Sequence, residues 1–166
     1  MNFRRLAPCW LGKRRRIATV SGAFIWALLP VWGTVAQADP AADMDAARDA
    51  FRHGRWAASD SLATAALTRL ESEETPDSVA IAVALSQIGF SRWRLVGYAD
   101  GTALRAATRA LGIFERQLGG DHRDVADAHS LVGILLRGMD QLDSAEVHAR
   151  RTVEIRTRAG DSDDLA

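Results

Sequence analysis

The chain has 166 residues, of which 48% are hydrophobic, and its 21 basic residues balance 21 acidic ones. This length and composition exclude a disordered tail and a collagen-like fibre, and they suit one globular domain. The single cysteine, Cys9, excludes an intrachain disulfide framework and a cysteine-rich zinc module. The balanced total charge argues against a general nucleic-acid-binding protein.

The first 38 residues have the composition of a secretory signal. They contain six basic residues and no acidic one, and an apolar run follows from Ile17. Small residues at Ala36 and Ala38 complete the basic, apolar and small-residue order of a signal peptide. The sequence therefore predicts a bacterial signal peptide over residues 1–38, cleaved after Ala38, and an exported product that is periplasmic or secreted.

An uncleaved anchor in the inner membrane is the alternative for the same segment. Residues 17–35 span 19 positions, close to the minimum for a membrane helix, but Pro30 and Gly33 interrupt the second half. A membrane partner is expected only if this segment is uncleaved. Removal of residues 1–38 leaves 15 arginines against 21 acidic residues, a net charge of −6. This acidic remainder strengthens the exclusion of nucleic acid as a partner.

From residue 39 onward, the spacing of apolar residues predicts paired helices without β-type alternation. The pattern indicates three pairs, at about 41–71, 77–118 and 122–159. Gly54 lies at the turn of the first pair, and a glycine-containing insertion near Gly97 interrupts the second. Asp121 is the expected N-cap of the first helix in the third pair. These elements predict an all-α domain over residues 39–166.

The predicted helices repeat along the chain. Residues 110–116 (ALGIFER) align with 152–158 (TVEIRTR) at a spacing of 42, and Ala103 aligns with Ala145. Residues 110–126 (ALGIFERQLGGDHRDVA), with 135–146 (LLRGMDQLDSAE), resemble tetratricopeptide repeats of the longer-period kind found in kinesin light chains and many bacterial repeat proteins. The resemblance implies a right-handed α-solenoid of about three antiparallel helix pairs that binds a protein or peptide partner.

Two positions depart from the repeat pattern: Asp140 occupies a turn where glycine is usual, and Ser59 replaces a small alanine. Residues 161–166 echo the beginning of the third pair, which predicts the start of a fourth. Each pair has an apolar face that only a neighbouring pair covers. We therefore expect an open C-terminal end that additional repeats or a partner chain would cover.

The sequence has no recognisable catalytic or cofactor pattern. It lacks an H-E-x-x-H metal motif, a G-x-S-x-G nucleophile elbow and a glycine-rich phosphate loop. We therefore predict a non-catalytic scaffold with no catalytic residue, no metal site and no cofactor. The alternatives are the sensor region of a larger enzyme, such as a caspase-like peptidase or a kinase, and a membrane-anchored assembly factor.

The candidate binding site is the concave face, which the first helix of each pair lines in such solenoids. The helical register places there Arg48, Phe51, Arg52, Ile88, Ser91, Ile134 and Arg137. Arginine, apolar and hydroxyl side chains in one groove suit an extended peptide with an acidic group. The alternative is that the arginines only solvate helix surfaces. Trp93 and Tyr98 are candidates for an exposed contact loop or for core packing.

Overall fold

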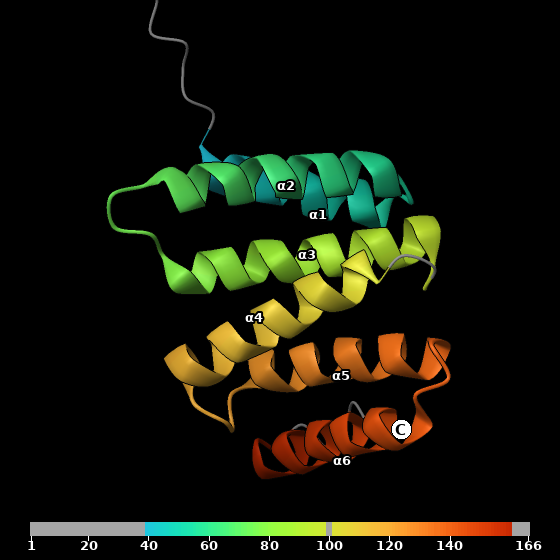
Figure 1. The fold of residues 1–166 in the computed structure, drawn as a ribbon. Coiled ribbons are helices and arrows are strands. Elements are labelled where there is room, and N and C mark those ends of the chain that lie inside the picture. The colour runs from blue at the N-terminus through green and yellow to red at the C-terminus, as the bar shows by residue number, and fades with distance from the viewer. Residues whose placement is uncertain (1–38, 99–100, 161–166) are drawn as a thin grey trace, which may run out of the picture. The chain divides into compact units, whose positions relative to one another are not determined.

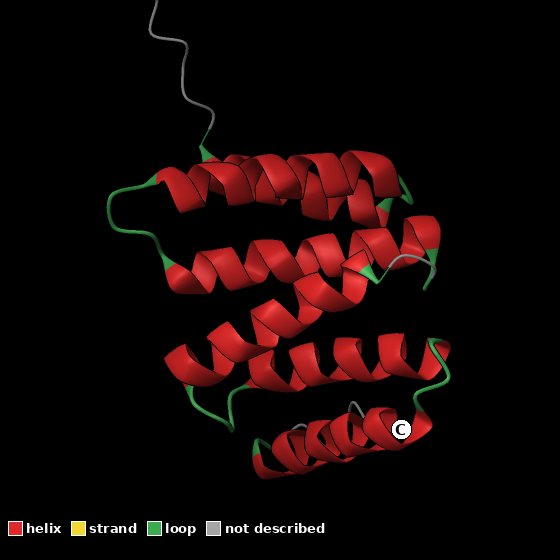
Figure 2. Cartoon of the chain, viewed as in Figure 1, coloured by secondary structure: helices red, strands yellow, loops and turns green. Residues whose placement is uncertain are grey.

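The computed structural model describes residues 39–98 and 101–160, which all lie in one compact unit (Figures 1 and 2). The predicted signal peptide over 1–38 and the predicted start of a fourth pair at 161–166 lie outside these residues. The described part of the chain is helical and contains no strand, which confirms the predicted all-α class.

The described helices follow one another as adjacent pairs. Their bounds are α1 (Pro40–Arg52), α2 (Trp56–Ser72), α3 (Ser78–Val96), α4 (Thr102–Leu118), α5 (Arg123–Gly138) and α6 (Leu142–Arg158). Each helix packs against the next one in the chain, and α3 also touches α1 and α5. Figure 1 shows this order, from α1 and α2 at one end of the unit to α6 at the other. The arrangement is that of a tetratricopeptide-like helical solenoid.

Two aspartates cap helices in the way their sequence positions favour. The side chain of Asp39 accepts a hydrogen bond from the backbone N–H of Ala41 at 3.0 Å, at the start of α1. Asp77 accepts one from the backbone N–H of Val79 at 2.9 Å, at the start of α3. Each carboxylate thereby satisfies a backbone N–H that has no partner within its own helix.

The predicted Asp121 cap of α5 is wrong by one residue. The N-cap is His122, whose Nδ1 accepts a hydrogen bond from the backbone N–H of Asp124 at 3.2 Å. Asp121 instead accepts a hydrogen bond from Arg158 of α6 at 2.9 Å. Because the carboxylate of Asp121 is used in this contact between α6 and the turn before α5, the next residue takes over the cap.

Small residues allow the helices of this unit to approach closely. Several alanines are fully buried, with an exposed fraction of 0%: Ala47, Ala63, Ala66, Ala107, Ala110 and Ala126. Ala103 and Ala145, which align at the repeat spacing, are also buried, with exposed fractions of 2% and 8%. The repeated alanines therefore occupy equivalent close contacts, as the repeat pattern predicts.

Helix α3 is the central helix of the described unit. It is long and apolar enough to cross a membrane by length and composition, and it alone passes that test among the described helices. The core helix of a soluble protein passes the same test, and α3 packs against α1, α2, α4 and α5. Contact on several sides explains why apolar residues occur around most of this helix rather than along one stripe.

Candidate functional site

The structure does not bring all the predicted groove residues to one surface. Ile88 and Ser91 of α3 are buried, with exposed fractions of 2% and 0%. The hydroxyl of Ser91 donates a hydrogen bond to the hydroxyl of Ser59 in α2 at 2.8 Å. Ile88 and Ser91 therefore do not lie on an exposed face, because the side of α3 that carries them packs inward. Val79 and Val83 occupy the position beside α1 instead.

A first groove lies among α1, the end of α2 and the start of α3, and has a volume of about 490 Å³. Arg48 lines it together with Met44 of α1 and the two α3 valines. The guanidinium of Arg48 donates a hydrogen bond to Asp45 at 2.7 Å. This groove contains one predicted binding residue, Arg48, but that arginine is already neutralised within its own helix.

Phe51 and Arg52 lie beyond this groove, near the end of α1. The ring of Phe51 packs edge-on against Trp56 with a centroid distance of 4.8 Å, and against Phe90 at 6.1 Å. Arg94 stacks over Trp56, 4.8 Å from the ring centroid. Arg52 is exposed, with its Nη2 3.6 Å from Asp49. Phe51 therefore belongs to an aromatic cluster that packs the turn of the first pair.

Of the two roles considered for Trp93 and Tyr98, the structure shows core packing. Both are partly buried and pack against the hydrophobic core. The ring of Tyr98 lies so close to Gly138, at the end of α5, that a Cβ there would come within 2.1 Å of it. Tyr98 therefore covers the end of α5.

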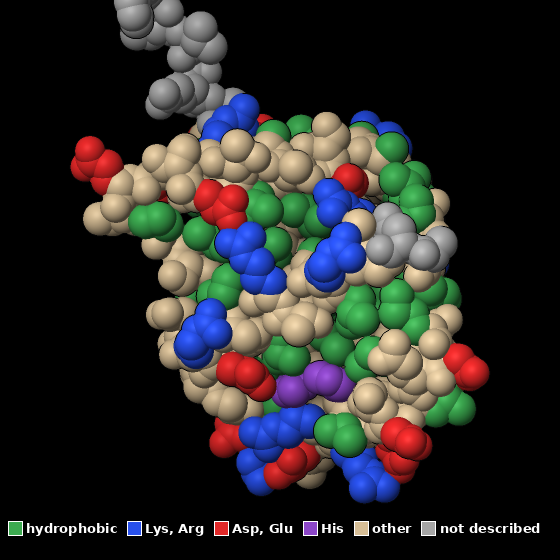
Figure 3. All heavy atoms as spheres, in the orientation of Figure 1, with side chains coloured by type: hydrophobic (Ala, Val, Ile, Leu, Met, Phe, Trp, Pro, Cys, Tyr) green, Lys and Arg blue, Asp and Glu red, His purple; other side chains and the backbone are tan. Residues whose placement is uncertain are grey.

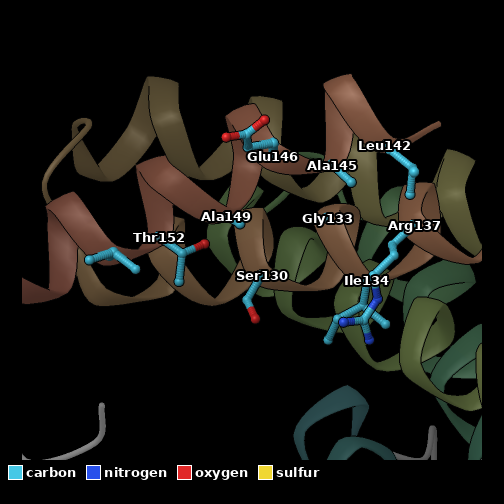
Figure 4. Close-up of a pocket in the computed structure, with 10 residues that line it drawn as sticks. Ser130, Gly133, Ile134, Arg137, Leu142, Ala145, Glu146, Ala149 and Thr152 are labelled. Atoms are coloured by element: carbon cyan, nitrogen blue, oxygen red, sulfur yellow. The ribbon is translucent and has the colours of Figure 1, made fainter.

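A second groove lies between α5 and α6 and has a volume of about 430 Å³ (Figure 4). Ser130, Ile134 and Arg137 form a row along α5, with successive spacings of four and three residues. Small residues from both helices lie between the two sides of the groove: Gly133, Ala145 and Ala149. A Cβ at Gly133 would lie 3.4 Å from the carbonyl oxygen of Ala145, so glycine permits the close approach of the helices.

The α6 side of this groove is apolar and exposed. Leu142 and Val153 line it, with exposed fractions of 58% and 48%. Val147, also on α6, is 66% exposed. Exposed apolar side chains of this kind are what the next pair covers within a repeat stack. The groove is therefore the open apolar end of the described helices.

One charge in this groove is not neutralised. Among the described residues, Arg137 has no ion-pair partner. Glu146, on the opposite side, accepts a hydrogen bond from Arg150 at 2.6 Å. The groove therefore offers a free guanidinium beside an apolar surface, and Ile134 and Arg137 are the predicted binding residues that it contains.

Residues 101–158 match the tetratricopeptide repeat family. The matched segment covers α4, α5 and α6, so both sides of the α5–α6 groove belong to it. This match supports a tetratricopeptide repeat protein. A comparison with curated proteins found no match.

The tetratricopeptide repeat segment also contains a histidine pair that sequence reasoning missed. The Nδ1 atoms of His129 in α5 and His148 in α6 are 2.9 Å apart, so one ring donates a hydrogen bond to the other. Oε1 of Glu115 in α4 lies 3.5 Å from Nε2 of His129. His129 lies nine residues before the end of α5 and His148 six residues after the start of α6, so their contact has no simple signal in the sequence.

The surroundings of the histidine pair favour neutral rings. Burial lowers the pKa of His129, and the charge of His148 lowers it further, while Glu115 opposes the change. Burial likewise lowers the pKa of His148, again opposed by Glu115. No group of three or more His, Cys, Asp or Glu residues that could hold a metal ion occurs in the described residues. The pair therefore joins α5 to α6 as a neutral hydrogen-bonded contact.

Proposed function

We propose that this protein is a non-catalytic scaffold that holds a segment of a partner protein in the groove between α5 and α6. The observation that carries this proposal is an open, apolar groove inside the tetratricopeptide repeat segment. Tetratricopeptide repeats are typically scaffolds for protein–protein binding and perform no catalysis themselves. The α5–α6 groove replaces the broader concave face as the proposed binding site.

The groove favours a partner segment with apolar side chains and one acidic residue. Apolar side chains of the partner would cover Ile134, Leu142 and Val153, and full burial of a side chain of this size contributes about 1.5–3 kcal/mol. A carboxylate would pair with Arg137, and an exposed pair of this kind contributes only about 0.2–1 kcal/mol. We therefore expect apolar contacts to supply most of the affinity and Arg137 to select the orientation of the segment.

The test is binding of the full chain to an array of peptides that combine apolar residues with one acidic residue. We expect Val153→Gln to lose the bound peptides and Arg137→Ala to weaken their binding by no more than about fivefold. Leu95→Gln is a matched control, because Leu95 and Val153 are both 48% exposed and Leu95 lies outside the groove. Arg48→Ala is the control for the arginine. Unchanged binding by Val153→Gln, or an equal loss in Leu95→Gln, would contradict the proposal.

We also propose the longer-period type of repeat, as in kinesin light chains. Helices α5 and α6 contain 16 and 17 residues, which nearly fill the usual period of about 34 residues before any turn is counted. The spacing of 42 between residues 110–116 and 152–158 agrees with the longer period.

We propose that the scaffold, over residues 39–166, acts outside the cytoplasm. The basic start, apolar run and small-residue end of residues 1–38 support this proposal. Mass spectrometry of the protein expressed with its complete N-terminus tests it. We expect an N-terminus at Asp39 in the exported fraction. An intact N-terminus in the membrane fraction would instead favour an anchor over residues 17–35.

A further inference from the structure

A third cavity lies among α2, α3 and α4 and has a volume of about 240 Å³. It shares no lining residue with the α5–α6 groove or with the groove beside α1. Its apolar lining comes from three helices: Leu67 of α2, Leu85 and Ile88 of α3, and Ala106 of α4. Leu85 and Ile88 are only 4% and 2% exposed, so they form the base of the cavity.

Three arginines surround this apolar base. Arg92 comes from α3, and Arg105 and Arg109 come from α4. Figure 3 shows arginine side chains, with acidic side chains beside them, where α2, α3 and α4 meet. The cavity thus combines an apolar interior with a positively charged rim.

The rim arginines are not equally neutralised. Arg92 donates a hydrogen bond to Asp60 at 2.8 Å, and Arg109 donates one to Glu71 at 2.5 Å. Arg105 has no ion-pair or hydrogen-bond partner among the described residues. The rim therefore has one positive charge in excess, and this charge belongs to Arg105.

The wall of the cavity also contains an unpartnered hydroxyl group. The Oγ1 atom of Thr64 is inaccessible to solvent and has no hydrogen-bond partner among the described atoms. Thr64 lines the cavity from α2, opposite the α4 arginines. Because this atom is inaccessible to solvent, it offers no contact at the cavity surface, and Arg105 is the polar group that a ligand can reach.

We propose that this cavity binds a small carboxylate with an apolar body. The carboxylate neutralises Arg105, and the apolar body lies on Leu67, Leu85 and Ile88. A carboxylate with an apolar body contacts both the guanidinium and the apolar base, whereas an uncharged apolar molecule contacts only the base and a bare anion only the guanidinium. The volume of about 240 Å³ limits the body to the size of a short branched chain. This site is independent of the proposed partner groove.

The test is a titration of the full chain with 4-methylpentanoate. Isothermal calorimetry measures the affinity, and the amide chemical shifts of α3 and α4 locate the site. We expect saturable binding. The amide 4-methylpentanamide, which keeps the body and lacks the charge, and acetate, which keeps the charge and lacks the body, are expected to bind at least tenfold more weakly. The absence of saturable binding, or equal binding of either control compound, would overturn the proposal.

Two matched variants test the position of the site. Arg105→Gln is expected to weaken binding of 4-methylpentanoate at least tenfold without changing thermal unfolding, because Arg105 is exposed and has no described partner. Arg116→Gln removes an exposed arginine of the same helix that lies outside the cavity, and its affinity is expected to stay unchanged. Equal affinities of these two variants would overturn the assignment of the carboxylate to Arg105.

Discussion

The first and last helix pairs follow the same plan but are packed with residues of different size. Fully buried alanines dominate the α1–α2 pair, with Ala47, Ala63 and Ala66 each 0% exposed. In the α5–α6 pair, the fully buried residues include Leu131 and Ile155. The same arrangement of two helices can therefore be packed either by close approach of the backbones or by interlocking large side chains.

The outer surfaces of the two pairs differ as well. Leu142, Val147 and Val153 of α6 are exposed, whereas no large apolar residue of α1 or α2 is exposed. A repeat stack needs a polar outer face at an end that remains in water. In the described unit, the α1–α2 end meets this requirement and the α5–α6 end does not, which is why the proposed partner site lies at the latter.

The largest expected effect on the free energy of unfolding comes from truncating a buried side chain in the core of the last pair. Leu131→Ala should lower the free energy of unfolding by about 2–5 kcal/mol, because a fully buried leucine leaves a cavity. Leu62→Ala in α2 should cost less than about 2 kcal/mol, because Leu62 is only partly buried. Urea unfolding followed by circular dichroism measures both. Equal losses would remove the proposed difference between the pairs.

A second prediction concerns the end of α5, which Tyr98 covers. Gly138→Ala should lower the free energy of unfolding by about 1–3 kcal/mol, because the new methyl group displaces the Tyr98 ring. In a Tyr98→Ala background, the same change should be neutral or stabilising, because alanine favours helix more than glycine does. Urea unfolding of the four variants forms a double-mutant cycle. Additive effects would show that the Tyr98 ring is not what requires glycine at position 138.

The third prediction is that acid weakens the last pair before the first. The pKa of both His129 and His148 lies below the ordinary value of 6.5, so protonation favours the unfolded chain. The contribution of the pair is therefore present above about pH 6.5 and is lost as the pH falls below that value. Amide hydrogen exchange should show faster opening of α6 than of α1 as the pH is lowered from about 7.5 to about 5.5.

Variants of the histidines separate this effect from general acid sensitivity. The double variant His129→Gln and His148→Gln should flatten the pH dependence of thermal unfolding over the same range. His53→Gln, which changes an exposed histidine of the first pair, is the control variant. A double variant with the same pH profile as the unmodified protein would refute the role of the pair.

The smallest expected effect distinguishes the two turns. Gly54 in the first pair has φ +72°, and Asp140 in the last pair has φ +61°. Asp140→Gly should raise the free energy of unfolding by about 0.5–1 kcal/mol, because glycine adopts positive φ without steric cost. Gly54→Asp should lower it by a similar amount. Urea unfolding measures both, and a loss of stability in Asp140→Gly would indicate that the aspartate side chain stabilises its turn.

The positions of the helices were predictable because their signals are local. Periodic apolar residues indicated each helix, and Gly54, Gly97 and Asp140 marked turns between them. The sequence also predicted that Ile134 and Arg137 share one face of α5, and both line the groove between α5 and α6. The sequence by itself therefore determined the helical class and the order of the elements.

Only the tertiary structure decided which face of α3 is buried. This helix packs against four others, so its apolar residues do not form one stripe from which an orientation can be read. Ser59 was a departure from the repeat and Ser91 a predicted groove residue, yet their hydroxyl groups meet at 2.8 Å in the core. That contact joins residues 32 positions apart. Its formation depends on the rotation of two helices about their axes, which packing determines and no local sequence pattern encodes.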